Sequence, residues 1–107
     1  MTIRETVHQG YDSQGKAVLG HKDYEVYPTS SLKGTIQVNG NVFTITHYWT
    51  HDAAHKRFTR FQCKSLNIDC ISPLFYTIDD ERLRKLLQTP TELVVRCKKA
   101  ACNIVTE

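Results

Sequence analysis

The chain has no run of apolar residues long enough to cross a membrane as a helix. Its longest nearly unbroken apolar stretch, Ile71–Tyr76, includes Ser72 and Pro73, whereas a membrane helix needs about 20 apolar residues. The first residues, Met1–Thr6, also lack the charged and then apolar pattern of a secretory signal. We therefore expect a cytoplasmic protein that has no membrane partner.

Sequence motifs of the common enzyme classes are also missing. There is no Gly-x-Ser-x-Gly nucleophile motif, no glycine-rich phosphate loop and no dinucleotide-binding fingerprint. The dense acidic run Asp79–Glu81 is explained by its place at the start of a predicted helix, where carboxylates meet the positive end of the helix dipole. We therefore expect a protein that is not an enzyme and binds no cofactor.

Low-complexity segments are absent, and the composition is that of an ordinary folded protein. Apolar residues make up 40% and charged residues 23% of the chain, which argues against disorder. A length of 107 residues is enough for one hydrophobic core and too short for two. We expect a single domain that spans residues 1–107.

The clearest local signal is Asn39-Gly40 between two alternating apolar segments. This dipeptide supplies the two positive-φ residues of a type I′ turn, so the sequence predicts a β-hairpin over Thr35–Thr46. The register that follows places four apolar residues on one face: Ile36, Val38, Phe43 and Ile45. The second strand is expected to continue to Trp49, and a third strand over Arg57–Cys63 completes a meander.

Other strands are predicted from shorter patterns. The Asp and Gly residues of Tyr11–Gly15 indicate a turn, and Pro28 stops a strand. The predicted strands are Ile3–His8, Lys16–Leu19, Asp23–Tyr27, Glu92–Lys98 and Asn103–Thr106, with a loop over Pro28–Gly34.

One helix is predicted, over Ile78–Gln88. Thr77 is placed to cap it, with Asp80 as the capping-box counterpart. Apolar residues at helical spacing form one stripe, and Pro90 ends the element; the stripe consists of Ile78, Leu83, Leu86 and Leu87. The fold class is therefore α+β, mainly β: an antiparallel sheet or partly open barrel with one short helix at about residues 78–88.

The four cysteines form two sequence pairs, Cys63 with Cys70 and Cys97 with Cys102. An all-cysteine zinc site usually uses two knuckles with a two-residue gap, and neither pair has that gap. Zinc ligation and disulfides stay open as alternatives. In a cytoplasmic protein the favoured interpretation is four ordinary, mostly buried thiols.

Three histidines, His47, His51 and His55, are spaced four residues apart. On a helix they would share one face, as metal-binding histidines do. The segment follows a hairpin turn and has strand composition, so only His51 and His55, beside Asp52, are expected near each other. A solvated polar loop is favoured over a metal site.

Positive charge is concentrated in the second half of the chain. Residues 56–99 hold ten lysines and arginines against five acidic residues. Within Lys56–Lys64, bases alternate with aromatic residues, and strand alternation places Phe58, Arg60 and Lys64 on one face. The predicted anion-binding residues are Arg57, Phe58, Arg60, Lys64, Arg96 and Lys98.

The sequence thus favours a small non-enzymatic protein with a basic sheet face that binds RNA, single-stranded DNA or an acidic protein surface. The first alternative is a protein–protein interaction module, such as a small inhibitor or adaptor of the sort that viruses and mobile elements encode. An exposed sheet edge would also allow a homodimer. The second alternative is a small zinc-stabilised domain, with the four cysteines as candidate ligands.

Overall fold

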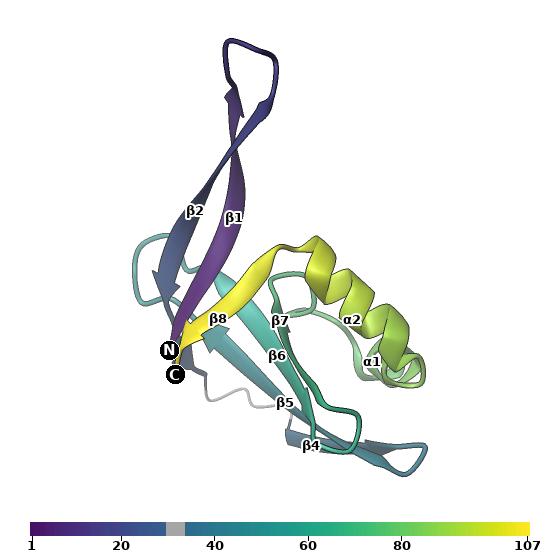
Figure 1. The fold of residues 1–107 in the computed structure, drawn as a ribbon. Coiled ribbons are helices and arrows are strands. Elements are labelled where there is room, and N and C mark those ends of the chain that lie inside the picture. The colour runs from purple at the N-terminus through teal and green to yellow at the C-terminus, as the bar shows by residue number, and fades with distance from the viewer. Residues whose placement is uncertain (30–33) are drawn as a thin grey trace.

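A computed structural model describes residues 1–29 and 34–107 and shows two antiparallel sheets and, within these residues, two short helices (Figure 1). One sheet, which we call the arm sheet, has the order β2-β1-β8. The central sheet has the order β3-β5-β6-β7, with β4 paired to β5. The strands are β1 (Thr2–Tyr11), β2 (Ala17–Glu25), β3 (Tyr27–Pro28), β4 (Gly34–Val38), β5 (Asn41–Trp49), β6 (Arg57–Cys63), β7 (Ile68–Ser72) and β8 (Cys102–Thr106); the helices are α1 (Asp80–Leu87) and α2 (Pro90–Lys99). The predicted α+β, mainly β class is confirmed.

The predicted hairpin is present as β4 and β5. Asn39 and Gly40 have φ angles of 51° and 79°, the left-handed values that a type I′ turn requires. Ile36 lies opposite Phe43, as the predicted register demands. The following strand β6 pairs with β5, so the predicted meander is confirmed as well.

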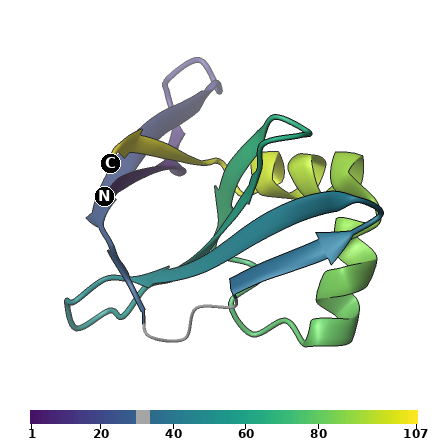
Figure 2. The same cartoon turned by 90° about the horizontal axis from the view of Figure 1, so that it is seen from below.

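Strand β6 is covered on both faces. Its successive side chains point alternately to one face and to the other. Phe61 points to the helices and joins one core; Phe58 points to the arm sheet and joins another. Figure 2 shows the helices and the arm sheet on either side of β6. The helix-side core contains Val38, Phe43, Ile45, Phe61, Cys63, Phe75, Leu83, Leu86, Leu87, Leu93 and Cys97; the arm-side core contains Ile3, Val26, Phe58, Ile71 and Cys102.

The predicted strand Glu92–Lys98 was wrong, because this segment lies in helix α2. Pro90 ends α1 but also occupies the first turn of α2, where its missing N–H costs nothing. Leu93 and Cys97 are both buried, one helical turn apart. Glu92 and Arg96 form an i,i+4 ion pair of 2.9 Å. The Val94-Val95 pair, typical of strands, is overridden by this helical pattern.

Smaller corrections concern element boundaries. Asp79, rather than Thr77, caps α1, since its carboxylate accepts a hydrogen bond from the backbone N–H of Arg82 at 2.8 Å. The strands predicted at Lys16–Leu19 and Asp23–Tyr27 are mostly one strand, β2, and β7 was not predicted. The loop predicted over Pro28–Gly34 falls largely on residues 30–33, which lie outside the described residues. Within the described residues, neither helix has the length and apolar character that a membrane span needs.

Candidate functional site

Phe58, predicted as an exposed stacking residue, lies inside the protein. Its exposed fraction is 0%, and its ring centroid is 5.8 Å from that of Tyr24 in β2. The prediction placed Phe58, Arg60 and Lys64 on one face of the strand and assumed that this face is open to solvent. The arm sheet covers the face at Phe58, so this ring is unavailable for stacking on a base.

Arg60 is held by two carboxylates beneath the arm sheet. Its Nε donates to Asp69 Oδ1 at 2.8 Å and its Nη2 to Asp69 Oδ2 at 2.7 Å. Nη2 also lies 2.5 Å from Glu107 Oε1, and the Arg60 side chain is only 8% exposed. The hydrogen bonds that Arg60 donates to Asp69 raise the pKa of this guanidinium above its ordinary value. Arg60 therefore links β6, β7 and the C-terminal residues, and its charge is neutralised.

The other four predicted basic residues lie at separate places. Arg57 is packed over the ring of Tyr76, 5.0 Å from the ring centroid. Lys64 follows β6 and lines a surface pocket beside Gly40 and Val42. The assignment of Arg96 and Lys98 to a strand face was wrong, because α2 carries them and they line two different pockets. The described structure thus forms no single surface from all six residues.

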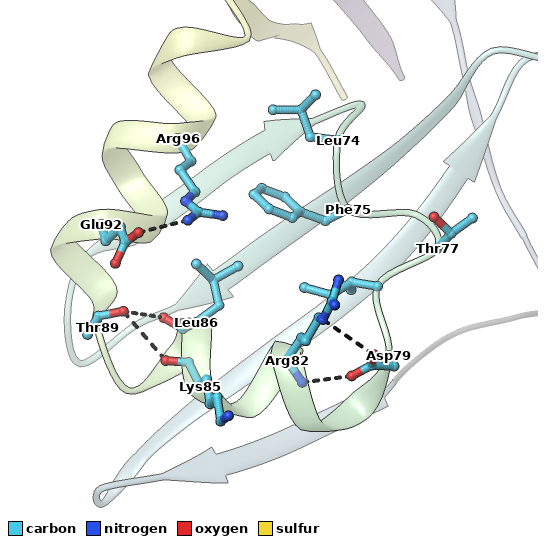
Figure 3. A pocket seen from close by; sticks show the side chains of 11 residues that line it. Leu74, Phe75, Thr77, Asp79, Arg82, Lys85, Leu86, Thr89, Glu92 and Arg96 are labelled. Atoms are coloured by element: carbon cyan, nitrogen blue, oxygen red, sulfur yellow. Dashed lines mark hydrogen bonds and ion pairs between the residues drawn. The ribbon is translucent and has the colours of Figure 1, made fainter.

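Arg96 lines the pocket between α1, α2 and residues 74–79, which has a volume of about 510 Å³ (Figure 3). The floor is apolar and includes Leu74, Phe75 and Leu86, and bases with their acidic partners stand around it. Arg96 pairs with Glu92, and Arg82 Nε lies 3.7 Å from Asp79. Because most of these cations are already paired, the pocket presents little free positive charge.

Arg60 and Lys98 do meet in another pocket, which we call the thiol pocket. It has a volume of about 660 Å³ and lies between β7, α2 and β8. Three of the four cysteines also line it: Cys70, Cys97 and Cys102. Cys70 Sγ and Cys97 Sγ are 3.1 Å apart. The thiol pocket therefore contains two of the six predicted anion-binding residues and three of the four cysteines, and its reactive groups are sulfur atoms.

The cysteines do not come together as a zinc site. Cys63 belongs to the helix-side core and lies 3.3 Å from Ser65 Oγ. Cys102 lies in the arm-side core, where burial raises the pKa of its thiol to about 11. Among the residues described, no group of three or more His, Cys, Asp or Glu side chains is placed to hold a metal ion. The zinc alternative thus has no geometric support.

The three histidines also lie in different environments. His47 is buried on β5, with Nδ1 2.9 Å from Thr59 Oγ1. His51 stacks on Tyr27 with ring centroids 4.1 Å apart. His55 has a φ of 46° in the turn between β5 and β6, and its ring lies 6.4 Å from that of Trp49. His51 and His55 lie in the loop between β5 and β6, which agrees with the favoured interpretation of a polar loop, whereas His47 belongs to the strand, as predicted.

A different feature stands out on the surface: the hairpin of β1 and β2 projects far from the rest of the protein (Figure 1). We call its outer part, residues 6–20, the arm. The molecule is 52 Å long but only 30 by 24 Å across. Every residue from Tyr11 to Leu19 is exposed. Because both faces of this part of the hairpin lie in water, burial of apolar surface does not explain the arm. A two-stranded hairpin of this kind is only marginally stable.

The arm is shaped by local contacts. Asp12 Oδ1 accepts hydrogen bonds from the backbone N–H groups of Gln14 and Lys16, each 2.9 Å long, which fix the turn. The register shifts between His8 and Gly10, a β-bulge that twists the ribbon. These contacts set the turn and the twist of the arm.

One face of the arm carries exposed apolar side chains beside an open strand edge. Tyr11 is 72% exposed and Leu19 is 64% exposed. His8 lies opposite Leu19, and its ring meets that of Tyr11 edge-on at 5.1 Å. In the order β2-β1-β8, the outer edge of β2 has no strand neighbour among the described residues. Sequence reasoning predicted two strands and the turn here, but it had no signal that the hairpin would stand apart from the core.

No protein family model, curated protein or solved structure matches this chain.

Proposed function

We propose that this protein is a non-catalytic, cytoplasmic protein-binding module whose arm pairs with a β-strand of a partner protein. The observation that supports this most directly is the exposure of Tyr11 and Leu19 next to the open edge of β2. An open edge offers backbone N–H and C=O groups to an incoming strand, and apolar neighbours add specificity and affinity. This hypothesis is the protein–protein alternative drawn from the sequence.

Charge favours a protein partner over a nucleic acid at this place. The arm contains Lys16 as its only Lys or Arg residue, and Asp12 lies on the same turn. Binding to phosphates depends on several lysines or arginines that displace counterions. The arm therefore suits a partner recognised by backbone pairing and apolar contact.

The test is site-specific photo-cross-linking from the arm. A benzophenone amino acid at position 19 should give one discrete cross-linked band in a lysate of the source cells, because Leu19 would lie within the contact. The same amino acid in place of Val95, an exposed residue of α2 with 45% accessibility, is the matched control and should give no such band.

The identity of the band separates the candidate partners. A protein band that disappears on competition with the unlabelled chain, and survives competition by the Leu19→Lys variant, supports the proposal. A band of twice the 12.3 kDa chain mass would identify a second copy as the partner. A nuclease-sensitive band would instead favour the nucleic-acid hypothesis, and equal labelling from positions 19 and 95 would refute an arm-specific contact.

The Leu19→Lys variant should itself fold normally. Leu19 is exposed and belongs to neither hydrophobic core, so we expect its free energy of unfolding to change by less than about 0.5 kcal/mol. Urea denaturation followed by circular dichroism checks this. A much larger loss would show that Leu19 stabilises the fold and would remove the reason to assign it to a contact.

A further inference from the structure

Cys70 and Cys97 face each other where β7 meets α2. Their sulfur atoms are 3.1 Å apart, while a disulfide bond is about 2.05 Å long, so bond formation requires a movement of roughly 1 Å. Both thiols are free in the structure. We propose that Cys70 and Cys97 form a peroxide-sensitive dithiol site, in which oxidation joins the two sulfurs and locks α2 onto β7. This site is separate from the arm and does not depend on its proposed role.

The other two cysteines are placed so that they do not compete. Cys63 belongs to the same helix-side core as Cys97, but its sulfur lies 3.3 Å from Ser65 Oγ. The Cys102 thiol faces the carbonyl oxygen of Ala100 at 3.4 Å and Glu5 Oε2 at 3.8 Å. Cys70 and Cys97 thus form the one close sulfur–sulfur pair among the four cysteines, all of which the structure describes.

The two thiols have different roles. The two sulfur atoms lie within hydrogen-bonding distance of each other, and this contact lowers the pKa of Cys70 and raises that of Cys97. The thiolate is the nucleophilic form of cysteine. Both cysteines line the thiol pocket, but Cys70 is half-buried whereas Cys97 is almost fully buried. Cys70 is therefore the attacking sulfur, and Cys97 is the resolving one.

The oxidation has two balanced steps with hydrogen peroxide as the oxidant. In the first step the Cys70 thiolate attacks one peroxide oxygen, the O–O bond breaks, and the hydroxide that leaves takes a proton to become water. This step produces Cys70 sulfenic acid. In the second step Cys97 loses its proton, and its sulfur attacks the Cys70 sulfur. The S–S bond forms, the S–O bond breaks, and the second oxygen leaves as water.

The cross-link would restrain a large part of the helical layer. The chain between Cys70 and Cys97 includes all of α1 and most of α2. A disulfide that closes a loop of this size removes much conformational freedom from the unfolded chain. We expect oxidation to raise the Tm by roughly 10 °C.

Tryptic mapping of the oxidised wild-type protein tests the pairing directly. Cleavage after lysine and arginine places the four cysteines in four separate peptides: Phe61–Lys64, Ser65–Arg82, Cys97–Lys98 and Ala100–Glu107. After peroxide treatment, quenching and alkylation without reduction, we expect Ser65–Arg82 linked to Cys97–Lys98, with the other two peptides alkylated. A different linkage, or oxidised Cys70 beside alkylated Cys97, would overturn the proposal.

Two variants check the assigned roles. Cys97→Ala should leave Cys70 as a sulfenic acid that dimedone traps, and oxidation should no longer raise its Tm. Cys102→Ala, a cysteine of the same pocket, is the matched control and should keep both the linkage and the rise in Tm. Loss of the linkage in Cys102→Ala, or dimedone labelling of Cys102 in place of Cys70, would contradict the assignment. The wild-type map decides the pairing even if one variant folds poorly.

Discussion

Replacement of Phe58 by alanine is expected to lower the free energy of unfolding by about 3–5 kcal/mol. The ring is completely buried in the arm-side core, with Ile3, Val26, Ile71 and Cys102 as the other buried members. Removing it would leave a cavity between β6 and the arm sheet that the strands cannot close without losing their pairing. Urea denaturation followed by circular dichroism measures the change.

The conservative variant Phe58→Leu is the control. It keeps most of the apolar volume, so we expect a loss below about 1.5 kcal/mol. If Phe58→Ala costs less than about 1 kcal/mol, the ring is not packed as the structure shows, and an exposed aromatic platform on β6 becomes tenable again. The measurement on Phe58→Ala therefore also tests whether burial excludes Phe58 from the predicted anion-binding residues.

The parts of the fold that depend on neighbouring residues were predictable. The β4–β5 hairpin follows from the positive φ angles that Asn39 and Gly40 readily adopt and from apolar alternation on either side. The site of α1 follows from the acidic run and the leucine stripe. Each signal lies within one short stretch of the sequence, so no knowledge of distant contacts is needed.

The misassignment of α2 shows where local signals fail. Val94 and Val95 favour a strand, but Pro90 starts a helix and Leu93 and Cys97 share one helical face. That face is buried against the central sheet together with residues of β4, β5 and α1. Packing against segments far away in the sequence therefore decides the helix, in opposition to the preference of two β-branched residues.

The site predictions failed to locate a basic surface for a related reason. Alternation correctly separates Phe58 from Phe61, but it cannot show that both faces of β6 are covered. Likewise, the sequence shows that Arg60 is a cation, but it does not reveal that Asp69 and Glu107 contact its guanidinium. The close approach of Cys70 to Cys97 also joins two distant segments, and the sequence holds no periodic signal for it.

The ion pair of Arg60 and Asp69 should respond unequally to the loss of its two members. The Arg60 side chain is 8% exposed, whereas that of Asp69 is 48% exposed. Asp69→Ala removes two hydrogen bonds from a buried cation that water cannot fully reach, and we expect a loss of about 2–3 kcal/mol. Glu107 still contacts the guanidinium and limits the loss. Arg60→Met fills a similar volume with an apolar chain and leaves Asp69 hydrated, so we expect a change of at most about 1 kcal/mol.

A double-mutant cycle isolates this asymmetry. In the Arg60→Met background no buried cation remains, so the added Asp69→Ala substitution should cost less than about 0.5 kcal/mol and the coupling energy should approach 2 kcal/mol. Free energies of unfolding from urea titrations of the four proteins supply the cycle. If Asp69→Ala costs the same in both backgrounds, the two residues act independently. Arg60 would then be free to serve an outside anion, as the sequence-based hypothesis requires.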